Sequence, residues 1–278
     1  MRTSILVLIL LTQLGGEAAA GQPKAEAAKA WERYIALTEA RVDSEHRDTQ
    51  NFLYPATASA DHRAALEARL KSGEVIVQKL TTTDDGKHIE APGALIHHWV
   101  GTAFIEKSTI KEAFAVLQDY DHHSTTYAPE VQRSQLLSHN GDDFTAYLRF
   151  VKKKVIAVVL DTYHQAHYGM LDATHAYSRS YTTKVSEIEA PGTPNEREKS
   201  AEEEEGFMWK MNTYWRFEER DGGLYIQCEA ITLTRNVPFG LAWIVEPFIT
   251  SIPKESLTST MVETRKALDD STRRAAAH

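Results

Sequence analysis

The sequence predicts an α+β fold in which an N-terminal helical segment precedes an antiparallel sheet of about seven strands and a long C-terminal helix. Three observations predict this fold. Residues 207–217 alternate apolar and polar side chains over eleven positions, which is the period of a strand. Turn-forming pairs such as Asn140-Gly141 separate the segments before it, as in a series of hairpins. Beyond Pro253, apolar residues recur at spacings of four, three and four, which is typical of a helix.

The first twenty residues have the pattern of a secretory signal peptide. Arg2 supplies the positive start, Ile5–Leu11 is an unbroken apolar run, and Ala18–Ala20 offers small residues for cleavage. The run is shorter than the roughly 20 apolar residues that a bilayer-spanning helix needs. We therefore expect residues 1–20 to be removed and the mature protein to be periplasmic or secreted in a bacterium. No later stretch is apolar enough to span a bilayer, so we expect no stable membrane insertion.

Composition narrows the classes of partner. The chain has 278 residues, a formal net charge of −8 and no long basic run, which argues against nucleic acid as a partner. Cys228 is the single cysteine, so no intramolecular disulfide can form. A hydrophobic content of 42% is ordinary for a globular protein, and we expect packing to supply the stability.

Residues 21–73 are predicted to form a helical extension. Apolar residues between Trp31 and Val42 recur at helical spacing on an otherwise charged segment, and residues 59–72 form a second predicted helix that Gly73 closes. Their apolar stripes are narrow. We therefore expect both helices to pack onto a larger body rather than to form a domain of their own.

The main domain is predicted to span residues 74–270. Two strands, Glu74–Leu80 and Ala94–Ile105, come first, and Thr109 with Glu112 forms a capping box that opens a short helix. The next segment, residues 119–129, is irregular with room for a second brief helix. The meander that follows is predicted at residues 131–138, 144–150, 155–168, 174–188, 207–217 and 224–235.

Two further segments complete this domain. The acidic loop, residues 189–206, is expected to be mobile and solvated, and we assign it no function. The C-terminal helix is predicted to begin near Pro253, because proline is tolerated in a first helical turn. A strongly apolar approach, residues 239–248, precedes it, and residues 271–278 form a tail.

This order of elements, with Asp119-Tyr120-Asp121 followed by Tyr127–Glu130, resembles the START-like, or SRPBCC, superfamily over about residues 94–268. The sequence looks closest to bacterial members of the polyketide cyclase or lipid-transport type. The resemblance implies a helix-grip fold, in which a curved antiparallel sheet wraps around a long C-terminal helix. It also implies a deep cavity between sheet and helix that binds hydrophobic ligands. The superfamily has no universal catalytic motif, so the resemblance assigns no catalytic residue.

Candidate ligand-contacting residues fall into an apolar and a polar group. The apolar group comes from strand 207–217, the approach segment and the C-terminal helix, and it comprises Trp209, Met211, Trp215, Phe217, Trp243, Phe248, Leu257 and Met261. The polar group shares one face of strand 174–188 and comprises Tyr177, Arg179 and Tyr181. The alternatives are that the aromatic residues fill the core and that the polar residues face solvent. An inward arginine would need a carboxylate such as Glu229, or an acidic ligand head group.

Metal binding and covalent catalysis find little support in the sequence. The pairs His97-His98 and His122-His123 are adjacent, so strand geometry would separate their side chains, and we expect neither a metal nor a cofactor. No nucleophile elbow or phosphate-binding glycine loop is present. Asp161 and Tyr163 could supply acid–base groups from one strand face, with His164 on the opposite face.

These observations lead to three functional hypotheses. The first is a non-enzymatic binding or carrier protein for a lipid or other hydrophobic small molecule, gated by the C-terminal helix and residues 239–248. The second is a cyclase- or aromatase-type enzyme that uses the same cavity, with Arg179, Tyr181 or Asp161 as polar participants. The third is a structural or interaction module whose cavity is packed shut. The sequence does not indicate the oligomeric state.

Overall fold

The computed structural model describes residues 21–53, 60–153, 157–236 and 242–276, and for residues 242–250 it describes the backbone alone. Its centre is a nine-stranded sheet in the order β1-β4-β11-β10-β8-β7-β6-β5, with β9 beside β8. The strands are β1 (Ile76–Lys79), β4 (Ala94–Glu106), β5 (Val131–Asn140), β6 (Asp143–Lys153), β7 (Ala157–Met170), β8 (His175–Glu189), β9 (Arg197–Glu198), β10 (Lys210–Arg220) and β11 (Gly223–Arg235). All described pairs are antiparallel, which confirms the predicted fold class.

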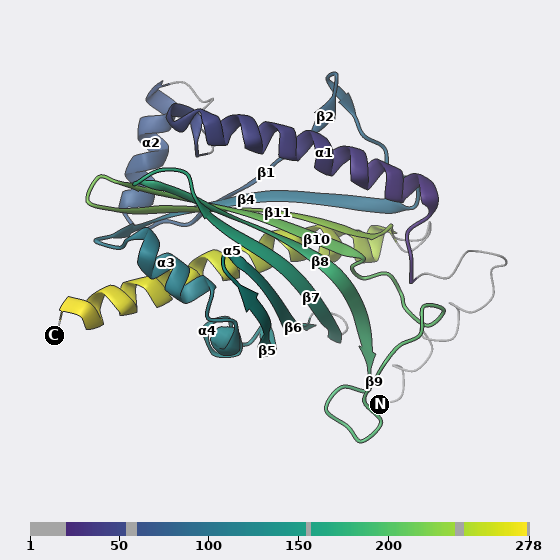
Figure 1. The fold of residues 1–278 in the computed structure, drawn as a ribbon. Coiled ribbons are helices and arrows are strands. Elements are labelled where there is room, and N and C mark those ends of the chain that lie inside the picture. Colours follow the sequence, from purple (N-terminus) through teal and green to yellow (C-terminus); the bar gives the residue numbers. More distant parts are fainter. Residues whose placement is uncertain (1–20, 54–59, 154–156, 237–241, 277–278) are drawn as a thin grey trace.

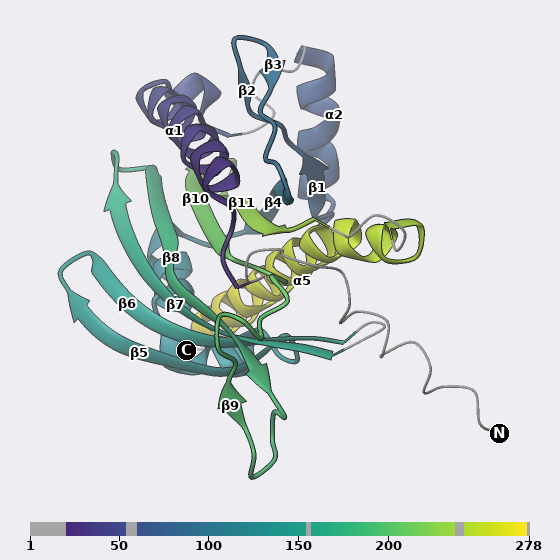
Figure 2. The ribbon, with the colours of Figure 1, turned by 90° about the vertical axis from the view of Figure 1, so that its right-hand side faces the viewer.

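Helices cover both faces of the curved sheet (Figures 1 and 2). One face, here called the inner face, carries α3, α4 and the long α5. The opposite, outer face carries α1 and α2, with the small hairpin of β2 and β3 beside them. The bounds are α1 (Ala25–Arg47), α2 (Ala60–Lys71), α3 (Ile110–Leu117), α4 (His123–Thr126), α5 (Ala242–Ala276), β2 (Thr83–Asp84) and β3 (Lys87–His88).

The alternation predicted for strand 207–217 places side chains on two faces of β10 as expected. Trp215 and Phe217 belong to the inner core, whereas Tyr214 and Arg216 point to the outer face. The outer side chains are nevertheless buried, because α1 covers them, and both Tyr214 and Arg216 are only 1% exposed. The central strands of this sheet therefore have two buried faces.

Helix α1 packs onto the sheet through the apolar stripe that the sequence indicated. Trp31 and Tyr34 contact a cluster on the outer face that includes Tyr214, Ile231 and Leu233. Its stripe is extended by further buried residues at helical spacing, Ala27, Ala30, Thr38 and Val42. The helical extension is thus a second layer on the sheet, as expected.

Two local sequence signals are confirmed. The Thr109 hydroxyl accepts a hydrogen bond from the Glu112 amide, while the Glu112 carboxylate accepts one from the Thr109 amide, so the capping box opens α3. At the tip of the hairpin between β5 and β6, Gly141 has a φ of +61°, a conformation that glycine adopts without steric cost.

The acidic loop and the start of α5 differ from expectation. The loop is tied to the sheet, because β9 pairs with β8 and the Glu187 carboxylate accepts hydrogen bonds from the backbone amides of residues 205–207. Lys184 and Arg149 of the sheet also pair with Glu198 and Glu196 of the loop, and most of the loop is nevertheless exposed, as expected. Helix α5 begins at Ala242, so Pro253 lies inside it. The cost of a proline within a helix is local, and the helix continues on both sides.

Candidate functional site

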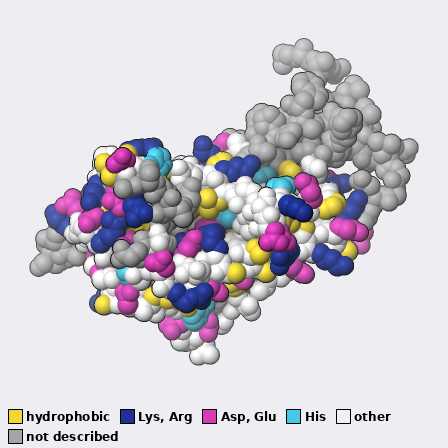
Figure 3. Space-filling view, turned by 90° about the horizontal axis from the view of Figure 1, so that it is seen from above, with side chains coloured by type: hydrophobic (Ala, Val, Ile, Leu, Met, Phe, Trp, Pro, Cys, Tyr) yellow, Lys and Arg dark blue, Asp and Glu magenta, His cyan; other side chains and the backbone are white. Residues whose placement is uncertain are grey.

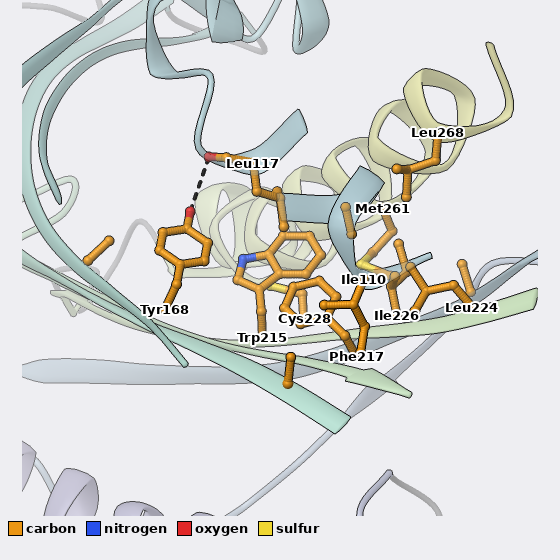
Figure 4. Close-up of a cluster of buried hydrophobic side chains, with 14 of the residues drawn as sticks. Ile110, Leu117, Tyr168, Trp215, Phe217, Leu224, Ile226, Cys228, Met261 and Leu268 are labelled. Carbon is orange, nitrogen blue, oxygen red and sulfur yellow. Dashed lines mark hydrogen bonds between the residues drawn. The ribbon is translucent and has the colours of Figure 1, made fainter. Parts of the chain in front are cut away.

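The inner face is densely packed at its α3 end (Figure 4). Here Phe217 and Ile226 of the sheet meet Met261 and Leu268 of α5, and all four are fully buried. Packing is so close that a Cβ atom placed on Gly101 would lie 2.7 Å from Cγ of Met261. This part of the inner face is a filled core.

Burial decreases along the inner face away from α3. Four rows of residues cross β8, β10, β11 and β4 in register. The first holds Ala176, Phe217, Ile226 and Ala103, and the second holds Ser178, Trp215, Cys228 and Gly101. The third holds Ser180, Thr213, Ala230 and Trp99, and the fourth, on three strands, holds Met211, Thr232 and His97. The first row is fully buried and Trp215 in the second is 8% exposed, but every member of the third row is half-buried.

The third and fourth rows are here called the open rows. Their small residues Ser180, Thr213, Ala230 and Thr232 are half-buried, as are Trp99 and Met211, whereas His97 is 7% exposed. Ser180, Thr213 and Ala230 are adjacent across three strands, so the centre of the curved sheet has little side-chain volume there. The Thr232 hydroxyl is shielded from solvent and has no hydrogen-bond partner among the described residues. Helix α5 lies over β1, β4 and β11 on this face. Trp215 of the second row borders the open rows, and Met211 is one of their members.

Titratable groups deeper on the inner face are held neutral. Burial lowers the pKa of both His164 and His123 to about 4. The Tyr168 hydroxyl donates a hydrogen bond to the carbonyl of Leu117 (Figure 4), and it lies 2.9 Å from the Tyr120 hydroxyl. Burial raises the pKa of Tyr120 to about 12. The interior near these groups thus carries no net charge at neutral pH.

The polar candidates Tyr177, Arg179 and Tyr181 lie on the outer face. They pair in register with Arg216, Tyr214 and Asn212 of β10, and they face α1, where Arg179 forms an ion pair with Asp43 and the Tyr181 hydroxyl donates to Glu39 at 3.0 Å. They do not lie between the sheet and α5, and they cannot line one cavity with Trp215. The reason is parity: β8 and β10 are in register, and the inner positions are Ser178 and Ser180.

Two other predicted residues, Asp161 and Trp209, also lie on the outer face. Asp161 lies on the outer face, where its carboxylate accepts hydrogen bonds from the Arg149 guanidinium at 2.6 and 2.7 Å. All three polar participants named for the enzyme hypothesis therefore lie outside the inner face. Trp209 also packs with the outer cluster, because β10 begins only at Lys210 and the alternation does not extend to it.

The remaining apolar candidates have different positions. Phe217, Leu257 and Met261 belong to the filled core, at 0%, 4% and 0% exposure. Trp243 and Phe248 lie where side chains are outside the described residues, as does much of the expected gate at residues 239–248. Ser180, Thr213 and Ala230 are not among the predicted ligand-contacting residues. Each lies two positions along its strand from another inward-facing residue, namely Ser178, Trp215 and Cys228 respectively.

A network of buried charges joins α1 to the sheet. Glu229 contacts Nε2 of His98 at 2.7 Å, the Arg41 guanidinium, and Nη2 of Arg216 at 3.6 Å. Burial alone would raise the pKa of Glu229, but these partners hold it at about 2. A buried arginine needs a carboxylate such as Glu229 beside it. Arg216 is such an arginine, but it lies on the outer face of the sheet.

Beside this network, an open hollow of about 520 Å³ lies between α1 and the β7–β8 hairpin. Its lining comprises Asp43, His46, Arg47, His167, Leu171, Tyr177, Arg179 and Tyr181. The three polar candidates are therefore brought together, but around this hollow. Seen from the side of α1, acidic and basic side chains are intermixed over the outer surface (Figure 3).

The described residues contain neither a cluster suited to a metal ion nor a helix suited to cross a bilayer. No group of three or more His, Cys, Asp or Glu side chains in this part of the chain is placed to hold a metal ion. Among the described helices, none is both long and apolar enough to cross a bilayer.

Several solved structures are similar to this chain over part of its fold, which is a curved antiparallel sheet with a long C-terminal helix on its inner face. A STAR-related lipid transfer protein from Xanthomonas axonopodis is 15% identical, with a TM-score of 0.42, covering 71% of this chain and 98% of its own. Human STARD10 is 8% identical, with a TM-score of 0.44, covering 80% and 84% respectively.

The Zhui aromatase/cyclase from Streptomyces sp. R1128 is 10% identical, with a TM-score of 0.39, covering 66% of this chain and 96% of its own. At these identities and TM-scores the similarity concerns the arrangement of helices and strands alone. No protein-family model and no curated protein sequence matches the chain.

Proposed function

We propose that the protein is a non-enzymatic binding or carrier protein for an apolar small molecule, held against the open rows of the inner face. The observation that carries the proposal is the gradient of burial along the inner side of β10, from fully buried at Phe217 to half-buried at Thr213 and Met211. We infer that the small side chains of Ser180, Thr213 and Ala230 leave room for a ligand at the centre of the sheet.

An apolar contact of ordinary size would give useful affinity. Burying about 300 Å² of apolar surface on the ligand and a similar area on the protein would gain roughly 15 kcal/mol. If association and ordering cost about 7 kcal/mol, about 8 kcal/mol remain. That corresponds to a Kd of about 1 μM. The unpaired Thr232 hydroxyl favours a ligand that also carries one hydrogen-bonding group.

The test uses Nile red, an uncharged apolar dye whose fluorescence increases on binding. Ser180→Phe would fill the third row, and Thr183→Phe places the same ring on an exposed position of the same strand. We expect Ser180→Phe to weaken Nile red binding at least tenfold and Thr183→Phe to leave it unchanged. Native mass spectrometry of the wild-type protein should reveal a co-purified apolar molecule. Failure of the wild type to bind Nile red, or equal binding by a folded Ser180→Phe variant, would contradict the proposal.

We further propose that the protein acts after export. The support is the signal pattern of residues 1–20, which lie outside the described residues. Expression of the full chain in a bacterium should give a mature protein in the exported fraction that begins at Gly21, as N-terminal sequencing would detect. A protein that keeps Met1 and stays in the cytoplasm would contradict this.

A further inference from the structure

The hollow on the outer face is a candidate for a second site, distinct from the open rows. Its floor is the outer side of β8, with Tyr177, Arg179 and Tyr181, and its wall is the last part of α1, with His46 and Arg47. Its volume of about 520 Å³ lies within the roughly 300–1,000 Å³ typical of small-molecule sites.

Positive charge predominates in the lining. Asp43 is the acidic lining residue, and the Arg179 guanidinium already neutralises it. Arg47 forms no ion pair with any residue in the described part of the chain. Burial, together with Arg216 and Arg179, lowers the pKa of His46 to about 4. Among the lining residues, the hollow therefore offers the Arg47 guanidinium as a cation whose charge no carboxylate of the lining offsets.

Two nitrogens next to the hollow have no hydrogen-bond partner in the part of the chain that the structure describes. They are Nε of Arg179, which is always a donor, and Nε2 of His46, which is a donor in one of its two neutral tautomers, and both are shielded from solvent. Buried donors without partners are rare in folded proteins, so the Arg179 nitrogen indicates a missing acceptor.

The rest of the lining is aromatic. The Tyr177 ring packs at 4.9 Å from the His46 ring and 5.9 Å from the His167 ring, measured between centroids, and the Arg179 guanidinium lies 5.7 Å from its centre. Tyr181 and Leu171 extend this surface. Flat rings beside guanidinium groups suit a planar organic anion better than a bare inorganic one.

We propose that the outer hollow binds a small aromatic carboxylate, whose carboxylate is held by Arg47 and Arg179 and whose ring lies against Tyr177 and Tyr181. This site and its ligand class are separate from the apolar ligand of the inner face. Nothing in the proposal requires the inner site to be occupied.

The test compares benzoate with benzamide, which has nearly the same shape but no charge. Binding is followed through the imidazole NMR signals of His46 and His167, with the exposed His88 and His122 as internal controls. Benzoate should shift the first pair and leave the second pair unchanged. Benzamide should bind at least about tenfold more weakly, because charge-assisted hydrogen bonds are roughly twice as strong as neutral ones.

A matched pair of variants locates the site. Arg47→Gln removes the unpaired guanidinium, and Arg33→Gln removes an exposed arginine from the same helix, where it pairs with Asp84. Both positions are exposed, so both variants should fold. Arg47→Gln should weaken benzoate binding about tenfold, and Arg33→Gln should not change it. Equal binding of benzamide, unshifted His46 and His167 signals at millimolar benzoate, or an unaffected Arg47→Gln variant would overturn the proposal.

Discussion

Replacing Glu229 with glutamine should strongly destabilise the protein, because the carboxylate is the buried counter-charge of three basic groups. Glu229 and Arg216 are each 1% exposed, and Arg216 would keep the half-buried Glu45 carboxylate at 2.5 Å and the Phe52 carbonyl at 2.8 Å. Removing one partner from a buried ion pair typically costs about 3–5 kcal/mol. The pKa of Glu229 gives an independent magnitude. A fall from 4.5 to about 2 on folding corresponds to roughly 3 kcal/mol, at about 1.4 kcal/mol per pKa unit.

The sign of the pH dependence follows from the lowered pKa. The stabilisation by Glu229 is fully present above pH 4.5 and is lost as the pH falls toward 2. Urea denaturation should therefore show Glu229→Gln to be about 3 kcal/mol less stable than wild type at pH 7, with a smaller difference at pH 3. Glu32→Gln, at an exposed position of α1, is the control and should change stability by less than about 0.5 kcal/mol. A Glu229→Gln variant as stable as wild type at pH 7, or a difference that does not shrink in acid, would refute this reasoning.

Three further outcomes are expected. Thr109→Ala removes the capping-box hydroxyl of α3 and should lower the free energy of unfolding by about 1 kcal/mol in urea denaturation, whereas an unchanged midpoint would contradict the cap. Gly101→Ala should cost about 1–3 kcal/mol by overpacking against Met261, and the additional change Met261→Ala should reduce its effect in a double-mutant cycle; additive costs would argue against the contact. The thiol of Cys228 is buried and its pKa is raised by burial, so a thiol-specific reagent should label it only after unfolding; rapid labelling of the native protein would show that the second row is open.

Strand alternation predicted which side chains share a face, but not which face points toward α5. On β8, parity correctly grouped Tyr177, Arg179 and Tyr181, yet it could not decide between the two sides of the sheet. The deciding contact pairs Arg179 with Asp43, 136 residues earlier in the chain. Such long-range ion pairs leave no local pattern. A polar strand face normally indicates solvent, and here it indicates a second helical layer.

Element boundaries limited the sequence interpretation in another way. Trp209 was grouped with Trp215 because the alternation looked continuous, but a single residue outside the strand is free to turn toward the other face. The small residues of the open rows carried no signal of their own. Ser180, Thr213 and Ala230 gain meaning only from register, which places them side by side across three strands.

The two proposed sites lie on opposite faces of the same strand, β8. Substitutions on this strand can therefore test both proposals together. On β8, Ser180 faces the open rows, while its neighbours Arg179 and Tyr181 face the outer hollow. Substitutions at alternate positions of one strand should therefore affect the two ligands separately. Ser180→Phe should weaken Nile red binding and leave benzoate binding unchanged. Arg179→Gln should weaken benzoate binding and leave Nile red binding unchanged. Loss of both ligands from each variant would mean that the strand had been distorted, whereas a clean exchange would show that the sheet presents a different site on each face.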